Sequence, residues 1–326
     1  MNDEKNYLSL THFLSKSLFL GIGLSKILII SKESTFFSLL LGTLIGVIIL
    51  FFINKVNNNS KIISFVIMYI LFIINLAEFV NLITSIYLID MNRFLIILPL
   101  LLVILYFNTK SISVHFKVSK ILLILIMFLF IIGYIVLIPS IDFLNYLPLY
   151  NVSFKKVLMC SLEFALYSSV PNIVYNNIDY NINNKNKKII MNYLISCFVL
   201  IIIFLIVQGV LGIELVNIFK YPEYVVFKRI NILNFIQNIE NILSFFWLII
   251  SIVYLSITSK IMYDISYKVF KKKYIYPIFL IISLFFINNY LFDSLEFLLF
   301  LYNYLWLILL LVLVIHFIKN IIRIKE

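Results

Sequence analysis

Three charged side chains, Lys26, Glu78 and Glu163, stand inside long apolar runs of this sequence. A lysine at the centre of a membrane helix costs about 2.5–3.5 kcal/mol unless another group pairs with it. A buried carboxylate is likewise either paired or protonated. We therefore expect Lys26 to be the counter-charge of the two acids. Two roles fit these residues: a carboxylate that carries a proton for coupling, and a purely structural ion pair that ties two spans together.

The lysine follows two closely spaced glycines in the stretch SLFLGIGLSKILIIS, residues 17–31. Gly21 and Gly23 each lower helix preference by roughly 1 kcal/mol relative to alanine, and the chain has only 7 glycines in 326 residues. This pattern predicts a membrane helix that breaks here, so that its exposed backbone forms a ligand site. The alternative is a glycine pair that packs against a neighbouring helix, with Lys26 reaching outward.

A second apolar run, VLMCSLEFALYSSVPNIVYNN, is also interrupted. Pro171 removes a backbone donor and clashes with the preceding turn, so the helix should kink or unwind around 168–172. A proline kink cushioned by serines is the simpler alternative. The two breaks fall in the first and sixth of ten predicted spans. That spacing predicts two inverted five-helix repeats with a ligand site between the breaks.

The two breaks offer complementary polar groups. Free N–H groups at the start of the outer half of the first span favour a carboxylate, as does the helix dipole. Backbone carbonyls at the end of the inner half and around Ser168 suit an ammonium group or a cation. An α-amino acid carries both groups and is the expected class of ligand. The residues expected to bind it are Phe19, Leu20, Gly21, Ile22, Gly23, Leu24, Ser25, Tyr167, Ser168, Ser169 and Asn172.

Composition places the chain among membrane proteins, since 63% of its residues are hydrophobic and the mean hydropathy is +1.09. The net charge of +11 lies in short loops between apolar runs, which indicates membrane topology rather than nucleic-acid binding. Cys160 and Cys197 fall inside predicted spans, so no disulfide is expected. His12, His115 and His316 are far apart and are expected at membrane interfaces. Neither a metal, a cofactor nor an enzymatic nucleophile–base pair is expected.

The charges of the loops orient the predicted spans. Loops after even-numbered spans and the two termini carry most of the lysines and arginines, so both termini are expected in the cytoplasm. The predicted spans are 11–31, 36–54, 62–88, 94–108, 118–138, 157–176, 188–211, 241–267, 274–291 and 297–318. Residues 1–326 then form one transmembrane domain, with repeats over 11–138 and 157–318, an outer connection over 139–156 and a cytoplasmic tail over 319–326.

Three further patterns are expected to be structural. Gly42 and Gly46 have the small-xxx-small spacing that is typical of close helix packing. Lys260 and Asp264 are four residues apart, so they face the same side of a helix and should pair. The outer connection 212–240 is amphipathic enough to hold a short helix on the outer face.

The run KYPEYVVFKRINI at 220–232, with Phe235, Glu240 and Phe246-Trp247 after it, resembles the loop and eighth span of spore germination permeases. These are the B subunits of germinant receptors, within the amino acid–polyamine–organocation superfamily. The stretches FLGIGLSKILII and FFSLLLGTLIGVIILFF are similar to the first two spans of that family. Asn238 stands where the family has an arginine, and the KIL tripeptide stands where a proline commonly follows the first break.

The resemblance implies a LeuT-like fold and a multi-pass protein in the inner membrane of a spore or the plasma membrane of a spore-forming bacterium. It also implies two partners, a larger membrane subunit and a lipoprotein subunit. The expected function is that of a permease-like subunit that binds a small nutrient at the membrane midplane and triggers germination. A proton-coupled amino acid transporter and a non-transporting scaffold subunit are the alternatives.

Overall fold

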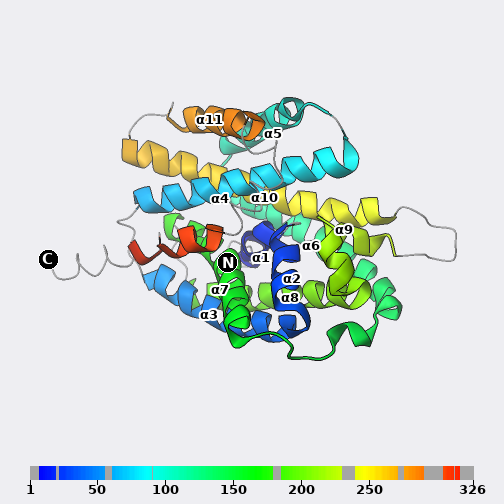
Figure 1. The fold of residues 1–326 in the computed structure, drawn as a ribbon. Helices are drawn as coiled ribbons and strands as arrows, with labels where there is room; N and C mark the ends of the chain where they lie inside the picture. The colour runs from blue at the N-terminus through cyan, green and yellow to red at the C-terminus, as the bar shows by residue number, and fades with distance from the viewer. Residues whose placement is uncertain are drawn as a thin grey trace.

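The computed structural model describes residues 7–19, 22–55, 61–89, 91–178, 185–229, 239–270, 275–289, 304–311 and 313–315. These residues form α-helices, 3-10 helices, one π-helix and their connections, and no strand lies among them (Figure 1).

The elements in chain order are α1 (Tyr7–Lys16), η2 (Ser17–Phe19), α2 (Ile22–Ser31), η3 (Lys32–Ser34), α3 (Thr35–Lys55), α4 (Lys61–Leu82), η5 (Ile83–Tyr87), α5 (Arg93–Asn108), α6 (Ile112–Leu137), η6 (Ile138–Ser140), η7 (Phe143–Tyr146), α7 (Phe154–Ser169), η8 (Val170–Asn177), α8 (Lys185–Ile218), α9 (Pro222–Phe227), α10 (Ile239–Phe270) and α11 (Ile275–Asn289). A further apolar helix runs over Tyr304–Ile315.

In the part of the chain that the structure describes, six helical stretches are long and apolar enough to cross a membrane, and each coincides with a predicted span or joins two. They are Gly23–Ile53, Lys61–Tyr87, Ile112–Ser140, Phe154–Asn177, Lys185–Ile218 and Phe245–Val269. The fourth, ninth and tenth predicted spans correspond to shorter apolar helices, and the first is interrupted. The all-helical membrane class is therefore confirmed for the described residues, whereas the ten-span inverted repeat stays a prediction.

The inner part of the first predicted span lies at the centre of the bundle. Helix α1 contacts α6, α7, α8 and α10, and every side chain from Ser9 to Phe19 is buried. In Figure 1, α3, α4, α8 and α10 run in roughly one direction, while α2 and α7 lie across them. Helix α7 contacts both α2 and α3. The two predicted breaks therefore belong to neighbouring elements in the middle of the fold.

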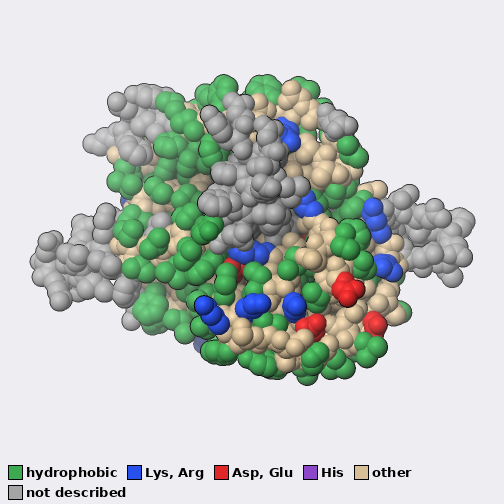
Figure 2. All heavy atoms as spheres, in the orientation of Figure 1, with side chains coloured by type: hydrophobic (Ala, Val, Ile, Leu, Met, Phe, Trp, Pro, Cys, Tyr) green, Lys and Arg blue, Asp and Glu red, His purple; other side chains and the backbone are tan. Residues whose placement is uncertain are grey.

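The periphery of the bundle is strongly apolar. Large apolar side chains such as Leu44 of α3 and Ile121 of α6 are exposed, at 61% and 68%. Figure 2 shows charged side chains gathered on the lower and right parts of one face, with apolar side chains over much of the left and upper parts. Continuous exposed apolar surface on long helices requires an apolar surrounding, which a lipid bilayer provides.

Two glycines of α3 allow the closest helix contacts. A Cβ atom on Gly42 would lie 2.8 Å from the backbone oxygen of Ser161 and 2.8 Å from a ring carbon of Phe164, both in α7. A Cβ atom on Gly46 would overlap the side chain of Tyr193 in α8. The predicted close packing through these glycines is confirmed, since α7 and α8 occupy the space that side chains would need.

The outer connection 139–156 is folded onto α8. The Tyr146 hydroxyl donates to the Leu205 carbonyl at 2.8 Å, and the Asn145 amide donates to the Gly209 carbonyl at 2.9 Å. The α8 backbone leaves helical geometry at Gly212, whose φ of 69° is a conformation that glycine adopts without strain. Burial raises the pKa of the Tyr146 phenol, which therefore stays a hydrogen-bond donor.

The second outer connection contains the short helix that its amphipathic pattern predicts, as α9 (Pro222–Phe227). Residues 230–238 of this connection lie outside the described residues. Helix α9 contacts α8 and α10, so it packs against two of the long helices.

We expect Gly42→Leu to lower the free energy of unfolding by about 1–3 kcal/mol, because the new side chain has to displace α7 backbone. Thermal unfolding of the purified protein in detergent measures the effect. The control is Leu44→Met on the exposed side of the same helix, which should leave the melting temperature unchanged. Equal melting temperatures for Gly42→Leu and the wild type would contradict the close approach of α3 and α7.

Candidate ligand site at the interrupted first span

The α-helix of the first predicted span is interrupted in its middle. Helix α1 ends at Lys16, one 3-10 turn follows over Ser17–Phe19, and α2 begins at Ile22. Leu20 and Gly21 lie outside the described residues, and only the backbone of Ile22 is described. The interruption falls where the glycine pair predicts it. An α-helix that begins at Ile22 cannot satisfy its first N–H groups from within its own length.

Helix α4 supplies a partner for the backbone at this interruption. The side-chain amide of Asn75 donates to the Ser17 carbonyl at 2.7 Å, and the Ser17 hydroxyl donates to the Leu14 carbonyl at 3.1 Å. Unpaired carbonyls cost several kcal/mol in an apolar interior, so these bonds stabilise the end of α1. They also mean that the Ser17 carbonyl already has a protein partner.

Phe19 joins the interruption to α7 and α8. Its ring centroid lies 5.2 Å from that of Phe164, 6.1 Å from that of Tyr167 and 5.7 Å from that of Phe204. All four rings are buried. Two predicted site residues, Phe19 and Tyr167, are therefore in contact, in an aromatic cluster that forms an apolar wall beside the break.

The sixth predicted span changes helix type and does not open. Helix α7 continues to Ser169, and η8 follows directly as a 3-10 helix with Pro171 in its first turn. The expectation that the Ser168 carbonyl is free for a ligand was wrong, because this carbonyl accepts a hydrogen bond from the Asn172 side-chain amide at 3.0 Å. A 3-10 helix uses i→i+3 bonds, so the chain accommodates the missing proline donor by tightening.

The polar side chains predicted on this span have mixed surroundings. The Asn172 amide also donates to the hydroxyl of Ser15 in α1 at 3.1 Å, and the Ser168 hydroxyl bonds that of Tyr193 at 2.8 Å. Among the described residues, the Ser169 hydroxyl and the Asn172 side-chain oxygen have no hydrogen-bond partner although both are buried. These two oxygens are the polar atoms that remain available to a ligand here.

A buried ion pair joins the two interrupted elements. The Lys26 ammonium of α2 lies 2.8 Å from a carboxylate oxygen of Glu163 in α7, and the two side chains are 7% and 0% exposed. The predicted counter-charge relation is confirmed for this pair. The second Glu163 oxygen has no hydrogen-bond partner in the described part of the chain. Leu24 and Ser25, two and one residues before Lys26, are buried in the first turns of α2.

Glu78 has a different electrostatic environment from the one expected. Its carboxylate interacts with the charges of Lys220, just before α9, and Glu223, within α9. The expectation that Glu78 pairs with Lys26 was therefore wrong. Its two oxygens have no hydrogen-bond partner among the described residues. Burial lowers the pKa of the Lys220 ammonium, and the Glu78 carboxylate opposes that change. Only the folded position of α9 brings these groups near α4.

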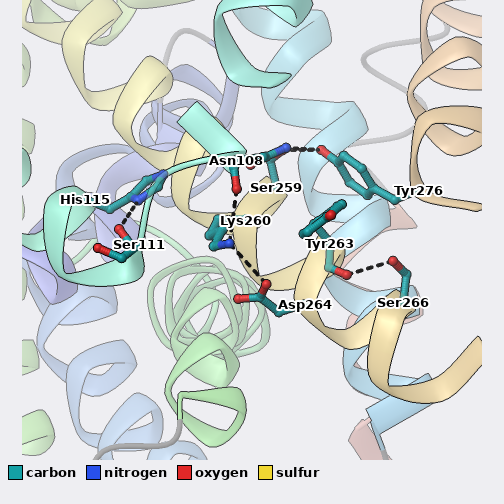
Figure 3. Close-up of polar contacts among 9 residues, drawn as sticks. All are labelled: Asn108, Ser111, His115, Ser259, Lys260, Tyr263, Asp264, Ser266 and Tyr276. Atoms are coloured by element: carbon teal, nitrogen blue, oxygen red, sulfur yellow. Dashed lines mark hydrogen bonds and ion pairs between the residues drawn. The ribbon is translucent and has the colours of Figure 1, made fainter. Parts of the chain in front are cut away.

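Polar residues of α5, α10 and α11 form a separate cluster (Figure 3). The Asn108 amide donates to the Ser259 hydroxyl at 2.8 Å and to the Tyr276 hydroxyl at 3.2 Å. The Lys260 ammonium donates to the Asn108 carbonyl at 3.1 Å and lies 3.2 Å from the Asp264 carboxylate. The predicted Lys260–Asp264 pair is therefore confirmed. A cavity of about 280 Å³ adjoins it, lined by Ile112, Asn177, Ile178, Ile261, Asp264, Tyr267 and Lys268.

Sequence reasoning missed two buried side chains of α1. Lys16 and His12 are 0% and 3% exposed, so both lie inside the bundle, and the expected position of His12 at a membrane interface stays a prediction. The available signal was a lysine and a histidine four residues apart inside the first apolar run. Cys160 and Cys197 are free thiols, as expected. In the described ranges, no group of three or more His, Cys, Asp or Glu side chains is placed to hold a metal ion.

A helical bundle with long apolar helices and apolar outer surfaces is the architecture of an integral membrane protein. The family model described as spore germination protein matches residues 60–298. The chain thus belongs to the spore germination protein family, which is a family of transporters and receptors. A search of curated proteins finds no match.

The Lys26–Glu163 pair should behave as a coupled unit. We expect Lys26→Met or Glu163→Leu alone to cost about 3–5 kcal/mol of stability, because each leaves an uncompensated buried charge. The double variant should recover most of that loss, since it removes both charges. Thermal unfolding of the three variants in detergent measures the coupling.

The Lys260–Asp264 pair, whose side chains are 13% and 42% exposed, provides the control. Lys260→Met should change stability by about 1 kcal/mol or less, because water screens this pair. Additive losses in the Lys26→Met/Glu163→Leu double variant would show that the two side chains are not partners.

Proposed function

We propose that this chain is the permease-like subunit of a germinant receptor, which binds a small nutrient of the amino acid class at the membrane midplane and triggers germination. One observation carries the proposal: the central helix is interrupted between α1 and α2, in a chain of the spore germination protein family. We further propose that the protein resides in the inner membrane of the spore with both termini cytoplasmic. Its partners are then a larger membrane subunit and a lipoprotein subunit.

The chemistry of the break supports a zwitterionic ligand. Helix α2 has ten residues, so the positive end of its dipole, at Ile22 and Gly23, attracts a carboxylate. The Ser17 and Ser168 carbonyls already accept hydrogen bonds, so we propose that the ammonium group binds buried side-chain oxygens of α7 and η8 instead. They belong to Glu163, Ser169 and Asn172.

The ion pair weakens the case for a scaffold with a dead pocket. An isolated Lys26 ammonium beside the break would repel the ammonium group of an amino acid. Because Glu163 lies 2.8 Å away, the pair is neutral overall. The break can therefore accept a zwitterion without adding net charge to the membrane interior.

A proton-coupled amino acid transporter is the second candidate. The observation that favours it is Glu78, a fully enclosed carboxylate whose oxygens have no hydrogen-bond partner among the described residues. A carboxylate in such surroundings is a natural proton acceptor. Uptake of radiolabelled amino acids into proteoliposomes under a pH gradient separates the two functions. Uptake that Glu78→Gln abolishes would indicate a carrier, whereas binding without uptake would indicate a sensor.

We expect Gly21→Leu and Ser169→Leu each to weaken amino acid binding at least tenfold, about 1.4 kcal/mol, because a branched side chain at either position would occupy the proposed ligand site. The measurement is the rise in melting temperature of the purified protein over a panel of L-amino acids, since a ligand stabilises the state that binds it.

Ser140→Leu, at an exposed position of η6, is the matched control and should bind like the wild type. If Gly21→Leu and Ser169→Leu insert normally and retain wild-type affinity, the ligand does not bind at the interruption. If no amino acid stabilises the wild type, the ligand class is wrong.

A further inference from the structure

Lys16 is an enclosed cation at the end of α1, directly before the interruption. Its side chain is 0% exposed, and its Nζ atom lies 4.9 Å from the ring centroid of Phe130 in α6. Among the described residues, Nζ has no hydrogen-bond partner. The thiol of Cys197 in α8 is close enough to interact with it electrostatically.

Comparison with Lys26, the other buried lysine of this region, shows that Lys16 lacks a carboxylate partner among the described residues. Lys26 has the Glu163 carboxylate at 2.8 Å, whereas Lys16 has an aromatic ring. A cation–π contact contributes roughly 0.5–2 kcal/mol, but removing an ammonium group from water costs several kcal/mol. The ring alone therefore does not offset the burial of a charged Lys16. An anion beside Nζ would.

His12 adds a second nitrogen on the same side of α1. It precedes Lys16 by four residues, which places both side chains on one face of the helix, and the charge of Lys16 acts on its ring. His12 is 3% exposed, and its Nε2 atom has no hydrogen-bond partner in the described part of the chain. Two adjacent buried nitrogen atoms thus lack acceptors.

A line of polar side chains connects these nitrogens to the candidate ligand site. The Cys197 thiol is hydrogen-bonded to Tyr193, and the Tyr193 hydroxyl is hydrogen-bonded to that of Ser168 in α7 at 2.8 Å. Lys16 is also followed immediately by Ser17, whose carbonyl is held by Asn75. An anion at Lys16 would therefore lie at the inner edge of the interruption.

We propose that Lys16 and His12 form a binding site for a compact monovalent anion. Two sources supply this chemistry: the carboxylate of the bound nutrient, and a free halide. The carboxylate source rests on the proposed function, whereas the halide source is independent of it. In both cases Lys16 holds the negative charge by an ion pair, and His12 donates a hydrogen bond from Nε2.

The test uses the purified full chain and its Lys16→Met variant, which keeps the length of the side chain and removes the charge. Melting temperatures are compared in sodium chloride, sodium bromide and sodium gluconate at equal ionic strength, and in gluconate with propionate, L-alanine or ethylamine. We expect the wild type to be stabilised by compact anions over gluconate, and Lys16→Met to lose at least tenfold in apparent affinity. Lys260→Met in α10 is the control and should respond like the wild type.

The salts that stabilise the protein show whether the anion is a free halide or the carboxylate of the nutrient. Stabilisation by chloride and bromide identifies a free halide, and stabilisation by propionate and L-alanine, but not by halide or ethylamine, identifies the carboxylate. Halide binding that persists when no amino acid binds would support this site while the proposed function fails. Equal anion responses of wild type and folded Lys16→Met would overturn the proposal. If Lys16→Met does not fold, crystals of the wild type grown in bromide and, separately, in propionate decide. An anomalous bromide peak or carboxylate density within hydrogen-bond distance of Nζ supports the site, and the absence of both refutes it.

Discussion

The contact on which the centre of this protein depends is the ion pair between Lys26 and Glu163. Two charges with 7% and 0% exposed side chains tolerate burial because their nitrogen and oxygen atoms are 2.8 Å apart. The pair joins α2, which begins after the interruption, to α7, which ends shortly before the 3-10 helix η8. The ion pair therefore holds α2 against α7, and it is lost if either Lys26 or Glu163 is removed.

Neutral hydrogen bonds hold the other side of the interruption. Helix α1 is attached to η8 through Thr11–Tyr175 at 2.7 Å and Ser15–Asn172 at 3.1 Å, and to α6 through Ser9. Helices that associate in lipid gain little from hydrophobic burial, so packing and polar contacts between helices dominate their association. The residues of α1 that make these bonds are small and polar, which lets the neighbouring helices approach closely.

The two buried lysines differ in how their charge is compensated. Lys26 has a carboxylate from α7, and its role is to hold α2 in place. Lys16 has an aromatic ring from α6, so any charge on it has to be matched from outside the described protein atoms. The two parts of the interrupted helix thus differ, since Lys26 of α2 has a carboxylate partner and Lys16 of α1 has an aromatic ring.

Membrane insertion and local helix breaks could be predicted from the sequence because both follow from neighbouring residues. Long apolar runs require a lipid surrounding, and Gly21, Gly23 and Pro171 disfavour a regular helix at their own positions. The spacing of Gly42 and Gly46 likewise indicated close packing. These features depend on composition and on intervals of a few residues, which the order of the chain contains directly.

The partners of the polar groups were decided by the tertiary structure. Lys26 could have paired with Glu78 or Glu163, and only the packing of α2 on α7 selects Glu163. The Ser17 and Ser168 carbonyls are occupied by side-chain amides, one from α4 and one from the next turn, and the burial of Lys16 arises from the position of α1 among four helices. The physical reason is range: propensity acts over one or two turns, whereas ion pairing and desolvation depend on residues that lie more than a hundred positions apart.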